Sequence, residues 1–173
     1  MKIGIYGGTF DPVHNGHTFL VNFLLENAFC DKIIITVAGD PPHKSDITSN
    51  QYDRLNMAKL AFSGCNTDVS DYEIKSGEKS YTYNTMNYFK ELYPDDEVYF
   101  ITGADAFFDL PDWYNGKNLI KENKFIAVDR SGLFKSKQYF EKYERVINKY
   151  NCNSIIVDVK TPDISSTKLR AML

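Results

Sequence analysis

Short apolar runs rich in β-branched residues alternate with segments of helical periodicity along the whole chain. Runs of the first kind are typical of strands covered on both faces, and segments of the second kind are typical of helices packed on a sheet. Strands are expected at residues 2–6, 32–38, 66–74, 97–105, 124–130 and 153–159. Helices are expected at residues 16–29, 50–62, 81–93, 137–150 and 164–173. This alternation predicts a doubly wound, Rossmann-like α/β fold, in which a parallel sheet with right-handed crossovers carries helices on both faces.

Local signals indicate where several of these elements begin or end. Asn15 is a residue type that caps helices and stands just before the first helical segment. Pro94 is expected to end the third helix. The proline-bearing polar segment 39–50 reads as a loop, and a capping serine is expected before the last helix. The buried side of the second helix is expected to carry Leu55, Ala58 and Phe62.

Length and composition fit one domain, residues 1–173, of a soluble protein with 43% hydrophobic and 25% charged residues. A net charge of −3 gives no basic excess for binding nucleic acid or a membrane surface. The three cysteines stand far apart, which favours neither a zinc ribbon nor a disulfide framework. The N-terminal "MKIGIYGG" lacks the apolar stretch of a signal peptide, so a cytoplasmic location is expected.

The segment "GGTFDPVHNGH", residues 7–17, follows the first strand and leads into the first helix. It lacks the GxGxxG spacing of dinucleotide sites, and no GxxxxGK[ST] loop occurs in the chain. Three interpretations remain: a phosphate-binding turn at a helix start, a capped helix with incidental histidines, or a zinc site. Zinc is disfavoured because no cluster of Cys, His or Glu stands beside His14 and His17 to supply a third ligand.

Other polar segments follow other strands: "GDPPHK" the second, "TGADAF" the fourth and "DISSTKLR" the last. Ligands of open parallel sheets bind beyond the carboxyl ends of the strands. These segments are therefore expected to gather around one ligand site at that edge.

The strings "HNGH" (14–17) and "ISSTKLR" (164–170) resemble two signatures of the nucleotidyltransferase superfamily. Within it, the chain resembles the bacterial nicotinate-nucleotide adenylyltransferase family, also through "GGTFDPVH", "PPHK", "SYT", "GAD" and "DWY". The resemblance runs from Met1 to about Arg170 in the same order. Where the family commonly has "RPG", this chain has "RSG" at 130–132.

The resemblance implies an enzyme of NAD biosynthesis that joins ATP and nicotinate mononucleotide, giving nicotinate adenine dinucleotide and pyrophosphate. The 5′-phosphate of the mononucleotide would attack the α-phosphorus of ATP directly, with no covalent enzyme intermediate. Such chemistry asks mainly for positioning and charge neutralisation. Mg²⁺ would be carried by ATP, with few protein ligands and no metal site built by the protein alone.

The resemblance also implies roles for individual residues. The phosphates would be held and the leaving pyrophosphate stabilised by His14, His17 and Arg170. ATP would further contact Gly8, Thr9, Phe10, Gly103, Asp105, Ile164, Ser165, Ser166 and Thr167. The mononucleotide would contact Lys44, Thr82, Trp113, Tyr114 and Arg130, with the indole ring stacked on the nicotinate.

Two alternatives stay open at this point. A phosphopantetheine adenylyltransferase of coenzyme A biosynthesis would share both motifs but needs no nicotinate pocket. A catalytically silent nucleotide sensor would keep the fold without the reaction. Many relatives form dimers or larger assemblies, so a homo-oligomer is also open. Family members commonly continue for a further helix or two, whereas this sequence stops at Leu173, as in a compact variant, a truncated chain or part of a longer protein.

Overall fold

The computed structural model describes residues 1–42 and 46–172. The chain divides into two compact units, one formed by Met1–Tyr81 with Thr161–Leu173 and the other by Thr82–Lys160. None of the helices formed by the described residues is long and apolar enough to cross a membrane.

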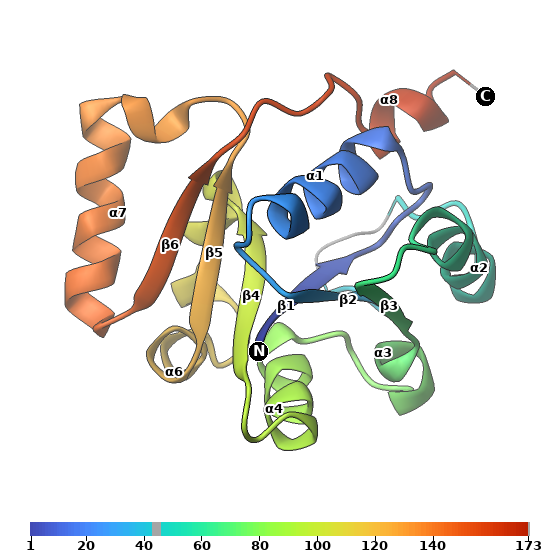
Figure 1. Ribbon diagram of the computed structural model, residues 1–173, viewed down its shortest axis with the longest axis horizontal. Helices are drawn as coiled ribbons and strands as arrows, with labels where there is room; N and C mark the ends of the chain where they lie inside the picture. The colour runs from blue at the N-terminus through green and yellow to red at the C-terminus, as the bar shows by residue number, and fades with distance from the viewer. Residues whose placement is uncertain (43–45, 173) are drawn as a thin grey trace. The chain divides into compact units, whose positions relative to one another are not determined.

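The first unit is built on three parallel strands (Figure 1): β1 (Lys2–Gly8), β2 (Lys32–Val37) and β3 (Thr67–Ser70). Its helices are α1 (Asn15–Glu26), α2 (Gln51–Ala61), α3 (Tyr72–Ser76) and α8 (Ser166–Arg170). The register places Ile5 opposite Ile34 and Ile35 opposite Val69. Aliphatic side chains from the strands and α1 fill the core, and several are fully buried: Ile3, Ile5, Leu24, Ile33 and Ile35.

The second unit also carries three parallel strands: β4 (Glu97–Gly103), β5 (Lys124–Asp129) and β6 (Asn153–Asp158). Its α-helices are α4 (Thr82–Leu92), α5 (Ala104–Phe107), α6 (Gly116–Glu122) and α7 (Lys137–Tyr150). Two short 3-10 helices are η1 (Leu110–Asp112) and η2 (Leu133–Lys135). Its core is aromatic, with the Phe107 ring 5.9 Å from Phe125 and 5.2 Å from Tyr143.

These parallel strands and interleaved helices confirm the predicted α/β class, but several boundaries were wrong. The strand expected over 66–74 ends at Ser70, because the chain turns into α3, which stops at Gly77 in the left-handed region (φ 67°). The helix expected over 16–29 ends at Glu26, where the Asn27 side chain donates to the carbonyl of Phe23. Helix α6 was not predicted.

The N-cap of α1 is His14 and not Asn15 as predicted. The His14 backbone is extended, with φ of −148°, and its ring accepts a hydrogen bond from the N–H of Gly16. An imidazole nitrogen thus fills the place that an Asn, Ser or Asp oxygen usually takes.

Arg54 on α2 is 2% exposed. Its guanidinium donates hydrogen bonds to four main-chain carbonyls. Its Nη1 lies 2.8 Å from the Thr9 carbonyl and 2.7 Å from that of Ala38. Weaker bonds reach Gly39 (3.4 Å) and Ser49 (3.3 Å). Burial lowers the pKa of this guanidinium, and the charge of Asp11 partly offsets the shift. Arg54 therefore ties the loop after β1 to the loop after β2.

We expect Arg54→Met to lower the free energy of unfolding by about 2–4 kcal/mol, because buried carbonyls that lose their donor cost ~1–3 kcal/mol each. Arg54→Lys should lose less, since an ammonium keeps the charge but reaches fewer acceptors. Urea unfolding followed by circular dichroism measures both. The control is Arg145→Met on the exposed side of α7, expected within about 0.5 kcal/mol of wild type. If Arg54→Met lowers the free energy of unfolding as little as Arg145→Met does, Arg54 does not hold the two loops together.

Asp129, 2% exposed at the end of β5, shapes the turn that follows it. Its carboxylate accepts from the backbone N–H groups of Ser131 (3.2 Å), Leu133 (2.8 Å) and Phe134 (2.8 Å). Burial alone would raise the pKa of Asp129, but these donors outweigh burial and hold the pKa below its usual value. The "RSG" turn is thus held by a carboxylate one residue before Arg130.

We expect Asp129→Asn to lower the free energy of unfolding by about 1–3 kcal/mol at pH 7, because the amide turns an NH₂ toward one set of backbone donors. A carboxyl with a depressed native pKa stabilises fully above its unfolded pKa of about 3.9 and loses that stabilisation as pH falls through the lower native value. The gap to wild type should therefore shrink below about pH 4 in urea unfolding at pH 3, 5 and 7. Asp109→Asn, an exposed carboxylate, should show no such gap; a gap that stays constant down to pH 3 would count against the proposed role of the charge.

Candidate functional site

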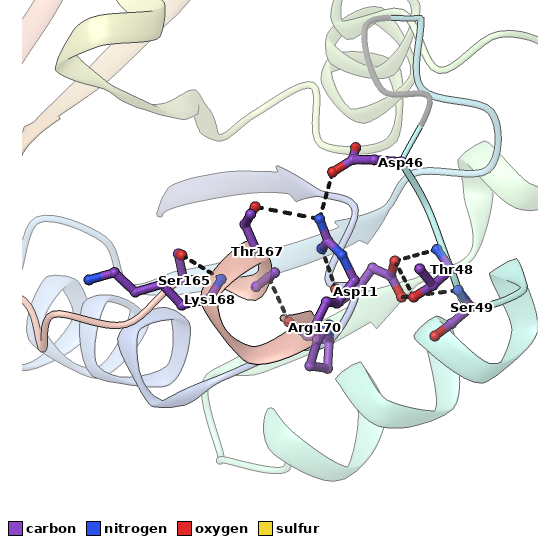
Figure 2. Close-up of polar contacts among 10 residues, drawn as sticks. Asp11, Asp46, Thr48, Ser49, Ser165, Thr167, Lys168 and Arg170 are labelled. Atoms are coloured by element: carbon purple, nitrogen blue, oxygen red, sulfur yellow. Dashed lines mark hydrogen bonds and ion pairs between the residues drawn. The ribbon is translucent and has the colours of Figure 1, made fainter. Parts of the chain in front are cut away.

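Two segments from opposite ends of the chain meet in the first unit. The Ser166 hydroxyl donates to the carbonyl of Pro12 at 2.8 Å, and Arg170 Nη1 donates to the carbonyl of Asp11 at 2.7 Å. Figure 2 shows α8 held against the loop after β1 in this way. In Figure 1, α8 lies beside the N-terminal end of α1. The segments "GGTFDPVHNGH" and "DISSTKLR", which were expected at the same edge of the sheet, are therefore in direct contact.

Gly16 of "HNGH" lies where the two motifs approach each other closely. A Cβ at this position would lie 3.0 Å from the His14 ring and 3.2 Å from a methyl group of Ile164. A side chain at residue 16 would thus require the His14 ring and the Ile164 side chain to shift by a few tenths of an ångström.

His14 and His17 form a stacked pair with ring centroids 3.7 Å apart and planes inclined by 24°. The Nδ1 of His14 accepts from the Gly16 N–H at 3.1 Å, and the Nδ1 of His17 accepts from the His14 N–H at 3.2 Å. An imidazole whose Nδ1 accepts carries its proton on Nε2 when neutral. The backbone thus fixes the tautomer of both rings and makes each Nε2–H a donor. The Gly16 N–H at the start of α1 is engaged by His14.

The loop between β1 and α1 is fixed by buried groups. Thr9 is buried, and its carbonyl accepts from Arg54. Phe10 adopts a left-handed conformation (φ 51°), which costs a non-glycine residue about 1–2 kcal/mol. Its buried ring packs edge-on against His17 (5.1 Å) and Phe62 (5.9 Å), and this packing holds the turn. Gly8 is the last residue of β1, and its carbonyl accepts from Ala38.

Asp11, 2% exposed, links this loop to the loop after β2. Its carboxylate accepts from the N–H groups of Thr48 (2.7 Å) and Ser49 (3.2 Å) and from the Thr48 hydroxyl. Burial alone would raise the pKa of Asp11, but these donors lower it below its usual value. An ionised carboxylate is therefore built into the base of the site.

A cleft of about 80 Å³ opens between these segments, lined by Thr9, Asp11, Asp46, Ile47, Ser166, Thr167 and Arg170. Pockets that enclose whole ligands measure about 300–1,000 Å³. This cleft therefore has the scale of one small chemical group and not of a whole nucleotide. Arg170 supplies the positive charge, with Nη2 2.6 Å from Asp46 Oδ2 and 3.4 Å from the Thr167 hydroxyl (Figure 2).

Ser165 is the N-cap of α8, as predicted for a serine, and accepts from the N–H of Lys168 at 3.1 Å. With Ile164, Ser166 and Thr167 it lies in the same unit as the histidines.

The second unit carries the other predicted site residues. The position that a Cβ of Gly103 would take lies 2.6 Å from Asp105 Oδ1 and 3.7 Å from Arg130 Nη2, so these three residues gather at the ends of β4 and β5. Trp113 follows η1, with its ring edge-on to Phe100 at 6.4 Å. The remaining two are Tyr114, which is 53% exposed, and Thr82, which opens α4. Lys44 lies outside the described residues.

Sequence reasoning missed Asp11, Asp46 and Arg54. Arg54 carried a signal, because with Ala58 and Phe62 it repeats every four residues on the apolar side of α2, where a cation needs a buried partner. Asp11 and Asp46 carried none, since their partners lie 37 or more residues away. Within residues 1–42 and 46–172, no three His, Cys, Asp or Glu side chains cluster as a metal site.

Comparison with known proteins adds a family to this geometry. The cytidylyltransferase-like family model matches residues 5–172. A probable nicotinate-nucleotide adenylyltransferase of Clostridium tetani is 37% identical over 171 residues, covering 98% of this chain and 85% of the relative. Its namesake from Clostridium acetobutylicum is 39% identical over 172 residues, with the same coverage of 98% and 85%.

A solved structure of similar fold is the Plasmodium falciparum nicotinic acid mononucleotide adenylyltransferase complexed with NaAD. It superposes with a TM-score of 0.79 at 24% identity and covers 98% of this chain and 82% of that one. This likeness confirms the Rossmann-like fold, and the sequence relatives confirm the resemblance drawn from the two motifs. The chain belongs to the nicotinate-nucleotide adenylyltransferase family of cytidylyltransferase-like nucleotidyltransferases.

Proposed function

We propose that this protein transfers the adenylyl group of ATP to nicotinate mononucleotide, giving nicotinate adenine dinucleotide and pyrophosphate in NAD biosynthesis. One phosphate oxygen of the mononucleotide forms a bond to the α-phosphorus as the bond from that phosphorus to the bridging oxygen of the β-phosphate breaks. Names of the sequence relatives and the NaAD complex of the structural neighbour support this choice.

The observation that carries the proposal is the junction of the two motifs. Ser166 and Arg170 are bonded to the carbonyls of Pro12 and Asp11, 154 and 159 residues earlier in the sequence. The junction brings a guanidinium, hydroxyls and the two histidines into one unit. The whole chain carries a net charge of −3. Local donors, and not a general positive field, would then hold the phosphates.

The histidines contribute as neutral donors. Since each Nδ1 accepts from a backbone N–H, each ring would present its Nε2–H to the phosphates of ATP. Donors held in place before the reaction stabilise the charge that moves onto the leaving pyrophosphate without a cost of reorientation. His14 and His17 thus cap the helix with one nitrogen and bind substrate with the other.

Arg170 would hold the β- and γ-phosphates together with Ser166 and Thr167, which line the same cleft. Ile164 and Ser165, just before them, would contact ATP as well. Gly8, Thr9 and Phe10 would offer the loop backbone to ATP from the opposite side. Gly103 and Asp105 would contact its nucleoside part. The mononucleotide would be held by Thr82, Trp113, Tyr114, Arg130 and Lys44.

Mg²⁺ would enter with ATP, would be held by few protein ligands and would supply positive charge that offsets the charge of the phosphates. Among nearby carboxylates, Asp11 is committed to Thr48 and Ser49. The cytoplasmic location and the homo-oligomer stay predictions.

Substrate choice is tested by supplying Mg-ATP with nicotinate mononucleotide, nicotinamide mononucleotide or phosphopantetheine and measuring pyrophosphate release. We expect the highest kcat/KM with nicotinate mononucleotide. Release with phosphopantetheine alone would favour the coenzyme A enzyme, and ATP binding without release would favour the nucleotide sensor. Either outcome would overturn the proposal.

The two roles of His17 can be separated by substitution. His17→Asn keeps an acceptor near the position of Nδ1 but lacks the Nε2–H, so we expect turnover to fall by roughly 10²-fold with little loss of stability. His17→Ala removes both roles and should lose a similar factor in turnover plus ~1 kcal/mol of unfolding free energy. Steady-state kinetics and thermal unfolding measure the two effects. Near-normal turnover of folded His17→Asn would mean that the phosphates lie elsewhere.

A further inference from the structure

The phosphate-binding face proposed for Arg170 already has a carboxylate on it. Arg170 Nη2 lies 2.6 Å from Asp46 Oδ2, while Nη1 is committed to the Asp11 carbonyl at 2.7 Å. Both Asp46 and Arg170 line the cleft between the motifs (Figure 2). A carboxylate oxygen on a guanidinium makes the same charge-assisted contact that a phosphate oxygen would make.

The Asp46 side chain can form or break its ion pair with Arg170 without disturbing the loop that carries it. Two and three residues later, the N–H groups of Thr48 and Ser49 are fixed by the Asp11 carboxylate. The Asp46 side chain itself is 64% exposed, whereas that of Arg170 is only 17% exposed. Rotation of the Asp46 side chain therefore breaks the ion pair while the anchors of the loop and the Arg170–Asp11 bond remain.

We propose that Asp46 is a built-in competitor for Arg170: its carboxylate holds Nη2 when no phosphate is bound, gives way to the β,γ-phosphates of ATP, and regains the guanidinium as pyrophosphate leaves. This inference rests on the phosphate-binding role given to Arg170 in the proposed function. A polyphosphate carries several charges against one on Asp46, so it wins the competition but with reduced net affinity. The same competition weakens the hold on the product and favours its release.

The expected size of the effect is modest. Ion pairs with an exposed partner are worth about 0.2–1 kcal/mol, which corresponds to a factor of about 1.5–5 in binding. Asp46→Asn keeps the shape of the side chain and removes its charge, so it should tighten the binding of inorganic tripolyphosphate and of ATP by about that factor. Pyrophosphate should inhibit the variant at correspondingly lower concentrations.

Asp40→Asn is the matched control, because Asp40 is an exposed carboxylate of the same loop whose ion pair is with Lys79. It removes the same charge without touching Arg170 and should alter affinity by less than ~1.5-fold. The second control is Asp46→Asn in an Arg170→Met background, where the gain should vanish if it acts through this pair. Isothermal titration calorimetry with tripolyphosphate, with and without Mg²⁺, measures each variant. Raising the salt to 0.5 M should shrink the gain.

Several results would overturn the inference. These are equal or weaker tripolyphosphate binding by Asp46→Asn, an equal gain in Asp40→Asn, or a gain that survives in the Arg170→Met background. Weaker binding only in the presence of Mg²⁺ would instead make Asp46 a contact of the metal. If the wild-type protein turns over nicotinate mononucleotide but Asp46→Asn binds tripolyphosphate no more tightly, this inference alone is rejected. If Asp46→Asn binds tripolyphosphate more tightly but the wild-type protein does not turn over nicotinate mononucleotide, the proposed function alone is rejected.

Discussion

Asp11 is held from two directions, and the arrangement of the candidate site depends on it. Its carbonyl takes a hydrogen bond from Arg170 near the end of the chain, and its carboxylate takes three from Thr48 and Ser49. Burial alone would raise the pKa of this carboxyl, and the donors outweigh burial and hold the pKa below its usual value. One residue therefore ties together three stretches of sequence: the loop after β1, the loop after β2 and helix α8.

The chemistry that this frame supports needs no nucleophile from the protein. Phosphoryl transfer depends on holding the reacting phosphates in line and on donors aimed at the leaving group. The stacked histidines suit this purpose, since the backbone sets which nitrogen carries the proton. A guanidinium adds the permanent charge. In the proposed function, the histidines at the start of α1 would donate from Nε2, and Arg170 on α8 would supply the cation.

The interiors of the strands and the motif positions could be predicted from sequence, because β-branched runs and motif order are local patterns. Element ends could not, because single side-chain bonds decide them, as where His14 caps α1 in place of Asn15. The meeting of the two motifs was predicted, but not the residues that hold them. Arg54 donates to main-chain carbonyls, which any residue supplies. The carboxylates of Asp11 and Asp46 accept from donors 37 and 124 residues away in the sequence.

The hydrogen bonds of Arg54 end on main-chain oxygens at Thr9, Ala38, Gly39 and Ser49. Replacing the side chain of an acceptor residue leaves its carbonyl in place, so the tie does not depend on which amino acids the two loops carry. Arg54 is the only residue of these hydrogen bonds whose side chain takes part. The two loops can consequently change composition while one internal cation keeps their spacing.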